Sequence, residues 1–307
     1  MQTIFSFINK PLGIILESIA GLVGGNFAAS VFIFTLLINL VLIPLNLKSQ
    51  KSAVQQLRIK PKLDDLKKRF GDDKQKYNEA MQKLYQEEKI SLSGGCLPMI
   101  LRLVFMMSIY YLIMQPLTYL MHIPTATIEA AKKAIDLGSN FRGNAELQII
   151  SAVRKDPSLS PEISAKLDDI SFNLFGIDLT DTPKFSFDIF NDFKLIWLIP
   201  ILAFAAQMLT SMLSMYQQKK QNPDAPNMAF MMLSMPLMSL FIGFTLPGGV
   251  GFYWICSSLI GGLIQYFTQE FYGPNKILAR ERVKELSAVA DTQIKQKNNA
   301  VNDAAEN

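Results

Sequence analysis

Five long apolar runs set the strongest limit on what this chain can fold into. The hydrocarbon core of a membrane is about 30 Å thick, and a helix needs roughly 20 apolar residues to cross it. The sequence meets that requirement at residues 27–47, 96–120, 195–215, 228–246 and 250–267. Hydrophobic residues make up 50% of the chain and charged residues only 18%, which is too apolar for a soluble protein of this length. We therefore predict an all-α integral membrane protein with five transmembrane helices.

The distribution of Lys and Arg predicts how these helices are oriented, because short loops rich in both residues stay in the cytoplasm. Residues 48–90 hold 12 Lys and Arg against 7 Asp and Glu, whereas residues 121–192 hold 7 against 11. The first loop is expected inside and the second outside. The N-terminus then lies outside and the C-terminus in the cytoplasm of a multi-pass cell membrane protein.

The segments between the spans have their own character. Residues 48–95 predict a basic helical hairpin that turns at Gly71, and residues 247–249 predict a tight outer turn. Residues 121–194 predict an extracytoplasmic loop with short helices, and residues 216–227 a cytoplasmic loop. Residues 268–307 predict a cytoplasmic tail that is partly disordered, because the sequence is polar from Ala288 onward.

The first 26 residues carry apolar side chains at helical spacing, which predicts an amphipathic helix retained at the extracytoplasmic interface. An unrecognised signal segment is the alternative. The stripe consists of Phe5, Ile8, Leu12, Ile15, Leu16 and Ile19.

Three polar residues interrupt the predicted spans. Arg102 lies roughly 8 Å from the cytoplasmic end of the second span at 1.5 Å per residue, and an arginine at a helix centre costs about 2.5 to 3.5 kcal/mol to insert. Asn39 lies at a broadly similar depth in the first span, and Gln207 interrupts the third. Snorkelling of Arg102 to the headgroups, and ordinary hydrogen bonds between helices for the amides, are the alternatives. Together, the three positions favour a shared wet cavity.

Several classes of function lack the residues they need. The five predicted spans contain no Asp or Glu to carry protons or cations, which disfavours coupled transport. No nucleophile-and-base pattern, P-loop or metal-binding motif occurs, so we expect no enzyme, no metal and no cofactor. The two cysteines, Cys96 and Cys256, suit neither a disulfide framework nor a zinc site, and His122 is interpreted as an interfacial residue.

At this point the residues resemble the YidC family of membrane protein insertases, which has relatives in mitochondria and chloroplasts. Three blocks carry the resemblance in the family's order: GGNFAASVFIFTLLINLVLIPL, SGGCLPMILRL and LPGGVGFYW. The resemblance implies five spans around a hydrophilic groove that opens to the cytoplasm and to lipid but is closed outside. It implies a chaperone that accepts nascent membrane protein segments in the groove and releases their apolar spans into the bilayer. The partners it implies are nascent chains, the ribosome, the Sec translocon, targeting factors and phospholipids, without nucleic-acid readout.

One departure from the family concerns the groove cation. Family members typically place an arginine where this chain has Asn39, and commonly a glutamine where it has Arg102, so the two positions look exchanged. The same resemblance places further residues in contact with substrate, with Gln207 a looser match: Thr35, Leu103, Met106, Ile242 and Trp254.

Other functions stay open from the residues alone. A small-solute channel or carrier of the inner membrane would need a pore open on both sides, and the tight outer turn disfavours it. A structural scaffold would tolerate an uncharged residue at position 102.

Overall fold

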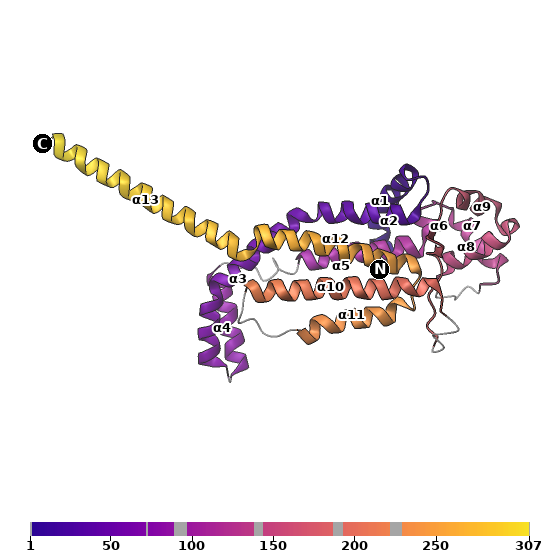
Figure 1. The fold of residues 1–307 in the computed structure, drawn as a ribbon, viewed down its shortest axis with the longest axis horizontal. Coiled ribbons are helices and arrows are strands. Elements are labelled where there is room, and N and C mark those ends of the chain that lie inside the picture. The colour runs from indigo at the N-terminus through magenta and orange to yellow at the C-terminus, as the bar shows by residue number, and fades with distance from the viewer. Residues whose placement is uncertain are drawn as a thin grey trace. The chain divides into compact units, whose positions relative to one another are not determined.

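The protein is almost entirely helical (Figure 1). A computed structural model describes residues 2–71, 73–88, 97–137, 144–186, 193–221 and 229–306, without the side chains of residues 2–6, 56, 97–99, 102, 221, 229, 231 and 297–306. The elements in chain order are α1 Gln2–Leu22, α2 Phe27–Val41, α3 Ile43–Phe70, α4 Lys74–Glu87, α5 Leu97–Met114, α6 Pro116–Tyr119, α7 Thr125–Ala134, α8 Ala145–Lys155, η2 Pro157–Leu159, α9 Pro161–Asp168, β1 Asn173–Leu174, β2 Ile177–Asp178, η3 Leu195–Trp197, α10 Leu198–Gln221, α11 Ala229–Gly243, α12 Gly248–Tyr272 and α13 Pro274–Glu306.

The chain divides into two compact units. The first unit comprises Met1–Ile43 and Ile100–Ile264, and the second comprises Pro44–Met99 and Gln265–Asn307. The first therefore holds most of the apolar helices and the whole of the long loop, by which we mean residues 121–194. The second holds the basic hairpin and the C-terminal helix.

Two helical segments are long and apolar enough to cross a membrane. They are Leu195–Lys220 and Gly248–Gln296, and a third is added if the bent pair Phe27–Val41 and Ile43–Gln55 counts as one span. The predicted spans at residues 96–120 and 228–246 contain shorter apolar helices, Leu103–Met114 and Met232–Gly243. The structure therefore confirms the prediction of a helical protein with two or three segments that are long and apolar enough to cross a membrane.

Proline explains why the predicted run at residues 96–120 is interrupted. Gln115 leaves the helical conformation, and Pro116 starts the short helix α6 at its first position, where the missing N–H of proline costs nothing. Pro247 lies directly before α12, and the chain reverses between α11 and α12 over Phe244–Pro247. The tight turn expected at residues 247–249 therefore begins a little earlier, and Gly248 and Gly249 already belong to α12.

The core of the first unit joins helices from both ends of the sequence. Leu16 of α1, Phe34 of α2, Leu112 of α5 and Val250 of α12 belong to one buried cluster, which continues into the long loop through Ile150 of α8. In α1 the buried positions Leu12, Leu16, Ile19 and Ala20 recur at helical spacing, and this face packs against α2 and α6. Of the predicted stripe, Leu12, Leu16 and Ile19 are buried, Ile8 is partly buried and Ile15 is exposed, while the side chain of Phe5 lies outside the described residues.

Glycines let α10 approach α12 and α11 closely. A methyl group built on Gly262 of α12 would lie 2.4 Å from Cγ2 of Thr210, and one built on Gly251 would lie 2.6 Å from Cγ2 of Ile199. On α11, a methyl group on Gly243 would lie 2.9 Å from Cβ of Pro200. Side chains larger than hydrogen at these positions would separate the helices.

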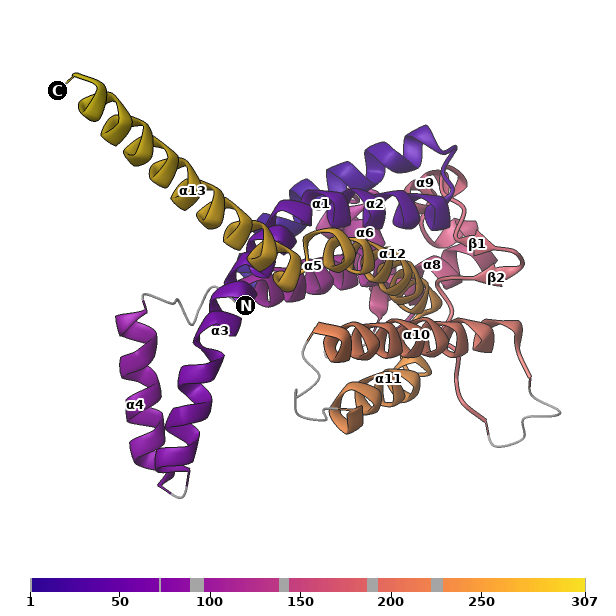
Figure 2. The ribbon, with the colours of Figure 1, turned by 60° about the vertical axis from the view of Figure 1, so that its left-hand side comes forward.

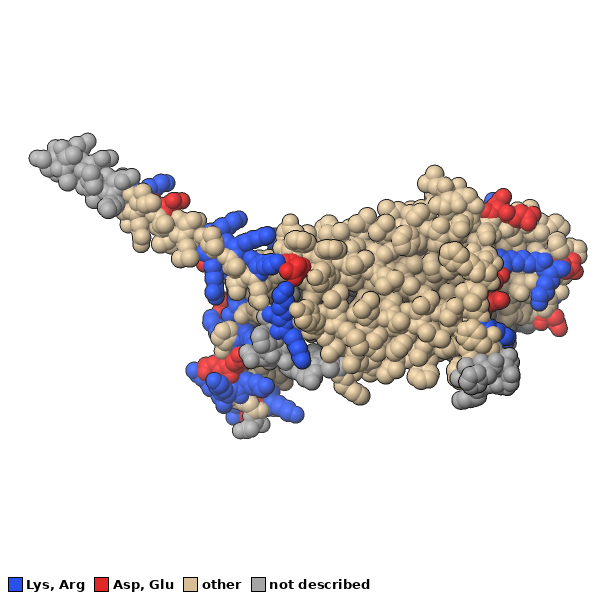
Figure 3. Space-filling model, viewed as in Figure 1, with Lys and Arg blue, Asp and Glu red and all other residues tan. Residues whose placement is uncertain are grey.

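The second unit contains a helical hairpin that turns at Gly71. Helix α4 starts at the N-cap Asp73, whose side chain accepts a hydrogen bond from the backbone N–H of Lys76 at 3.1 Å, and this bond lowers the pKa of Asp73. Lys62 of α3 forms an ion pair with Glu88 just beyond α4. Lys and Arg side chains gather on this hairpin in Figure 3.

The C-terminal segment differs from the expectation of a disordered end, because α13 runs from Pro274 to Glu306. The sequence beyond Pro274 contains neither Gly nor Pro and is rich in Ala, Lys, Glu and Gln, all good helix formers. Within the second unit, Arg58 of α3 forms an ion pair with Glu281 of α13 at 2.6 Å.

Candidate functional site

Thr35 and Asn39 form a polar ladder on α2. The hydroxyl of Thr35, only 1% exposed, donates to the carbonyl oxygen of Val31 at 2.6 Å. Nδ2 of Asn39 donates to the carbonyl oxygen of Thr35 at 2.8 Å. Both donors are therefore satisfied by the helix's own backbone, as is common for such residues in apolar helices. The bond leaves the lone pairs of the Asn39 side-chain oxygen to accept hydrogen bonds.

Helix α5 carries three of the residues predicted for the groove, and the described ones differ in their burial. Arg102 lies in α5, but its side chain is outside the described residues. Leu103 is 55% exposed, whereas Met106, one turn further along, is partly buried against the core. The structure thus brings Met106, but not Leu103, into the packed interior.

Gln207 joins α10 to α11 through a residue that the sequence analysis missed. The single hydroxyl hydrogen of Ser239 of α11 is shared between Oε1 of Gln207 and the carbonyl oxygen of Pro236, each 2.8 Å from the hydroxyl oxygen. Ser239 could have been noticed in the sequence because it follows Pro236 by one turn in an apolar helix. Proline removes a backbone hydrogen bond, and a nearby serine often bonds to the backbone there. Gln207 therefore has the helix-to-helix bond that the sequence analysis kept as its alternative.

Trp254 and Ile242 complete the predicted set. Trp254 of α12 is partly buried and packs against the same core as Met106, whereas Ile242 of α11 is exposed. Met106 and Trp254 therefore pack against one core, Thr35 is buried on α2 beside core residues Val31 and Phe34, and Gln207 is linked to α11.

Asn9 and Ser108 are among several further polar side chains that are buried in the first unit and were not predicted. Asn9 of α1 is 1% exposed and Ser108 of α5 is fully buried. Neither the amide of Asn9 nor the hydroxyl of Ser108 has a hydrogen-bond partner within the described part of the chain. Because buried polar groups are nearly always hydrogen-bonded to protein or water, both positions call for water or a polar ligand.

The long loop is joined to the start of α2 by backbone hydrogen bonds. The N–H of Phe27 donates to the carbonyl oxygen of Ser171 at 3.0 Å, and the N–H of Ser171 donates to that of Gly25 at 2.9 Å. Gly25 has a φ of 75°, and a methyl group there would lie 2.0 Å from the carbonyl oxygen of Asp169. Only glycine allows both the conformation and this close approach.

The same loop is joined to the start of α12. The N–H of Gly248 donates to the carbonyl oxygen of Asp181 at 2.8 Å, and the N–H of Gly249 donates to that of Leu179 at 2.7 Å. These are N–H groups of the first turn of α12, which have no partner within the helix itself. We call these four backbone bonds, two to the start of α2 and two to the start of α12, the loop seam.

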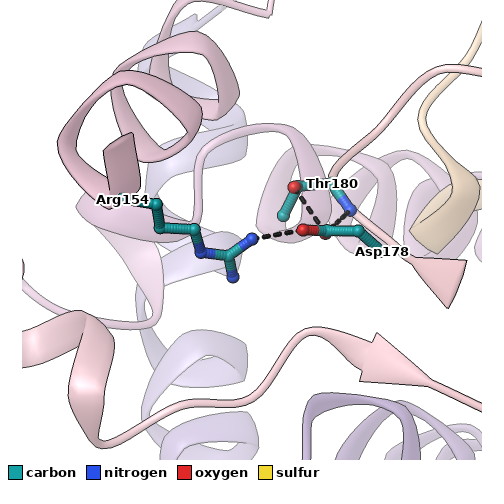
Figure 4. A network of polar contacts seen from close by, with 3 residues as sticks. All are labelled: Arg154, Asp178 and Thr180. Atoms are coloured by element: carbon teal, nitrogen blue, oxygen red, sulfur yellow. Dashed lines mark hydrogen bonds and ion pairs between the residues drawn. The ribbon is translucent and has the colours of Figure 1, made fainter. Parts of the chain in front are cut away.

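Arg154, Asp178 and Thr180 hold the loop in place beside the seam (Figure 4). Arg154 of α8 pairs with Oδ2 of Asp178, while Oδ1 of Asp178 accepts from the backbone N–H of Thr180 at 2.9 Å and from its hydroxyl at 2.6 Å. The guanidinium carbon of Arg154 lies 5.2 Å from the ring centroid of Phe172, and that ring lies 4.7 Å from the ring of Phe27. A chain of contacts therefore runs from α8 to the first residue of α2.

A cavity of about 370 Å³ opens beside this network. Its walls include Arg154, Asp168, Ser164, Asn173 and Asp178, all from the long loop. It contains none of the residues that the sequence predicted for a groove.

Glu146 is a buried carboxylate in the long loop. Its two oxygens accept hydrogen bonds from the backbone N–H of Thr118 at 3.1 Å and from the Thr118 hydroxyl at 2.6 Å. Thr118 lies in the first turn of α6, so Glu146 satisfies an N–H that the helix leaves unpaired. Burial raises the pKa of Glu146, although the bonds from Thr118 act in the opposite direction.

The histidine and the cysteines do not form a reactive site in the described part of the chain. His122 pairs through Nδ1 with Oε2 of Glu17 at 3.3 Å, and both side chains are exposed. Cys256 is a free, buried thiol, while Cys96 lies outside the described residues. Across the described ranges, no group of His, Cys, Asp and Glu is placed to hold a metal ion.

Comparison with known proteins gives one family and several relatives. Residues 18–275 match the family model of the 60Kd inner membrane protein. A membrane protein insertase YidC of Dinoroseobacter shibae is 28% identical over 273 residues, covering 88% of this chain and 38% of the relative. The protein of the same name from Rickettsia massiliae is 26% identical over 271 residues, covering 87% of this chain and 39% of the relative. The protein of the same name from Pseudomonas fluorescens is 39% identical over 109 residues, which cover 36% of this chain and 19% of the relative.

This chain spans less than half the length of the relatives that it matches along most of its own length. The family match covers all of the apolar helices from α2 to α12 and more than half of the chain. The chain therefore belongs to the 60Kd inner membrane protein family.

Proposed function

We propose that this protein is a membrane protein insertase and chaperone. It takes short hydrophilic segments of nascent membrane proteins into a positively charged groove and releases their apolar spans into the bilayer. The observation that carries the proposal is the family match over residues 18–275, among relatives that are named membrane protein insertases.

Polar groups inside the first unit support a hydrated groove. Thr35, Asn39, Asn9 and Ser108 come from three helices that share one apolar core, and the polar atoms of Asn9 and Ser108 lack protein partners in the described chain. Hydrogen bonds from water to the Asn9 amide and the Ser108 hydroxyl would avoid the free-energy penalty of leaving these buried groups unpaired. A wet notch shortens the distance over which a polar segment of substrate must leave water.

In this proposal, Arg102 supplies the cation of the groove, and Asn39 offers its side-chain oxygen to the guanidinium. Thr35, Leu103, Met106, Gln207, Ile242 and Trp254 contact the passing chain. A guanidinium in a low-dielectric setting attracts acidic or carbonyl-rich segments strongly. The driving force comes from burying the apolar span of the substrate, at about 25 cal/mol per Å².

The loop seam supports closure of the groove on the side of the long loop. The loop bonds to the first residues of both α2 and α12, so it covers the ends of two core helices. We infer that this is the extracytoplasmic side, because the loop has more acidic than basic residues. Five spans, a cytoplasmic hairpin formed by α3 and α4, and contacts with the ribosome, the Sec translocon and targeting factors belong to the same proposal.

The decisive experiment replaces Arg102 and measures insertion of a small membrane protein with a charged translocated tail. Arg102→Ala is expected to reduce insertion several-fold, while Arg102→Lys retains most of it. Lys133→Ala, which removes an exposed charge from α7 in the long loop, serves as the matched control and is expected to insert normally. Photocrosslinking from residues 39, 102 and 254 to a stalled nascent chain would locate the substrate.

Normal insertion by Arg102→Ala at equal protein abundance would contradict the charged groove. A small-solute channel is the rival function, and it predicts solute flux through liposomes that does not depend on Arg102. Crosslinks at all three positions without such flux would decide for the insertase.

A further inference from the structure

The β-hairpin of the long loop ends in an unusual turn. Phe175 and Gly176 connect β1 to β2, and both have positive φ angles, 48° and 86°. Such two-residue turns favour Asn-Gly, because bulky side chains are strained at positive φ. The side-chain oxygen of Asn173 accepts the N–H of Gly176 at 2.8 Å, which holds the turn in this shape. A phenylalanine therefore occupies a position that suits asparagine better.

The ring of Phe175 also lies outside the packed structure. It is 92% exposed, although its neighbour Ile177 is buried. Exposure of the ring and strain of the backbone are both unfavourable in water. Strained residues that persist in a structure often mark functional positions.

The tip of the hairpin lies at the level where a membrane-spanning helix begins. A methyl group built on Gly176 would lie 4.0 Å from Cδ2 of Leu195, and β2 packs against η3. Leu195 is the first residue of the span Leu195–Lys220. Figure 2 shows the hairpin beside this end of α10. Because the segment Leu195–Lys220 is long and apolar enough to cross a membrane, its Leu195 end would place the tip near one surface of the bilayer.

Aromatic side chains gather at the same level. Trp197 of η3 lies 5.8 Å from the ring of Phe185, 6.1 Å from that of Phe193 and 5.8 Å from that of Phe244. Phe185 and Phe193 are half exposed. Belts of aromatic residues typically mark the boundary between headgroups and hydrocarbon. The exposed ring of Phe175 therefore lies on the hairpin that packs against η3, the start of this aromatic group.

We propose that Phe175 inserts into the bilayer leaflet at the Leu195 end of α10 and makes the β1–β2 hairpin a membrane anchor. The partner is the phospholipid surface itself, and the contact does not depend on the insertase function. The anchored hairpin leads directly into Leu179 and Asp181, whose carbonyl oxygens accept the two bonds of the loop seam from α12. Lipid would therefore help to fix the loop over the end of the bundle.

Depth-dependent quenching tests this contact. Phe175→Cys, in a background with Cys96→Ser and Cys256→Ala, is labelled with the polarity-sensitive fluorophore NBD and placed in phosphatidylglycerol–phosphatidylethanolamine nanodiscs. Lys133→Cys, on an exposed face of α7, is the matched control. We expect blue-shifted emission at position 175 and quenching by spin-labelled lipids several-fold stronger than at position 133.

Equal, water-like emission and weak quenching at both positions would overturn the proposal. Blue-shifted emission that spin-labelled lipids do not quench would also overturn it, because the ring would then be covered by protein. A second pair of variants distinguishes the effect of residue 175 on the turn from its contact with lipid. Phe175→Asn should fold normally, since asparagine tolerates positive φ, whereas Phe175→Trp should gain a tryptophan that brominated lipids quench.

Discussion

Gly249 donates its backbone N–H to the carbonyl oxygen of Leu179 at 2.7 Å, which ties the start of α12 to the long loop. A methyl group on Gly249 would lie 2.9 Å from Cγ2 of Ile113, 3.3 Å from the Leu179 oxygen and 3.4 Å from Cε1 of Phe27. A side chain at position 249 would therefore crowd both Ile113 and the acceptor oxygen of this hydrogen bond.

Gly249→Val is expected to lower the free energy of unfolding by about 1–3 kcal/mol, because the added methyl groups overpack the seam. Thermal unfolding of the purified protein in detergent would measure the loss. Gly21→Ala is the matched control, since nothing lies within 4 Å of a methyl group at that position in α1. The control should instead gain about 0.5–1 kcal/mol from helix propensity. Equal effects of the two changes would contradict the close packing at Gly249.

Gly262 and Thr210 make a pair suited to a double-mutant cycle. Gly262→Ala should destabilise the protein by about 1–3 kcal/mol, because its methyl group would lie 2.4 Å from Cγ2 of Thr210. Thr210→Ser removes that Cγ2 and keeps the hydroxyl that donates to the carbonyl oxygen of Gln207 at 3.0 Å. The double variant should recover most of the loss, which unfolding in denaturant can measure. Additive losses would show that α10 and α12 do not touch at this point.

Glu146 predicts a dependence of stability on pH. Its pKa is raised by burial in the folded protein, so the unfolded chain loses this proton first as the pH rises. Stability from this group is fully present below the unfolded value of about 4.3 and is lost as the pH rises through the higher folded value. Glu146→Gln keeps an acceptor for Thr118 but cannot ionise, so its melting temperature should change less between pH 4 and pH 8 than that of the parent.

Glu146→Ala separates hydrogen bonding from charge. It leaves the N–H and hydroxyl of Thr118 without their partner, and this should cost about 1–3 kcal/mol at both pH values. A glutamine variant with the pH dependence of the parent would show that another group titrates.

Asp178 combines two roles that substitutions can separate. Asp178→Asn removes the charge partner of Arg154 but keeps an oxygen for Thr180, so a loss below about 1 kcal/mol is expected for this partly exposed ion pair. Asp178→Ala also removes both bonds from Thr180 and should cost about 1–2 kcal/mol. Hydrogen exchange at the amides of Thr180 and Gly249 would reveal the difference, with faster exchange in the alanine variant only. Indistinguishable exchange would mean that the seam does not depend on Asp178.

The exchanged residues at positions 39 and 102 predict a rescue. If the groove needs one cation regardless of the helix that carries it, Asn39→Arg combined with Arg102→Gln should insert substrate better than Arg102→Gln alone. The measurement is the fraction of a short-tailed substrate that reaches the bilayer, normalised to the abundance of each variant. Failure of the double variant to improve on Arg102→Gln would tie the charge to α5.

The apolar helices could be predicted from the sequence because their length and composition are local properties. The runs at residues 195–215 and 250–267 predicted α10 and α12, and Pro116 explains why α5 ends early. The helical end of the chain could have been predicted from propensity alone, since residues after Pro274 include no Gly or Pro.

Contacts between distant segments could not be predicted in the same way. The pairing of Ser239 with Gln207 depends on how α10 and α11 pack, and the bonds from Ser171 to Gly25 and Phe27 join residues far apart in sequence. The β-hairpin was also missed, because each strand has only two residues and Phe-Gly is a poor turn signature. Glycines such as Gly25 and Gly249 indicate that another segment approaches closely at these positions. The sequence does not show which segment that is.

All four bonds of the loop seam connect main-chain atoms, so no seam donor or acceptor belongs to a side chain. Substitution of exposed loop side chains that contact neither the core nor Asp178 leaves the donors and acceptors where they are. Distant members of this family could thus diversify the surface of this loop, and whatever meets it, while the bundle keeps the same lid.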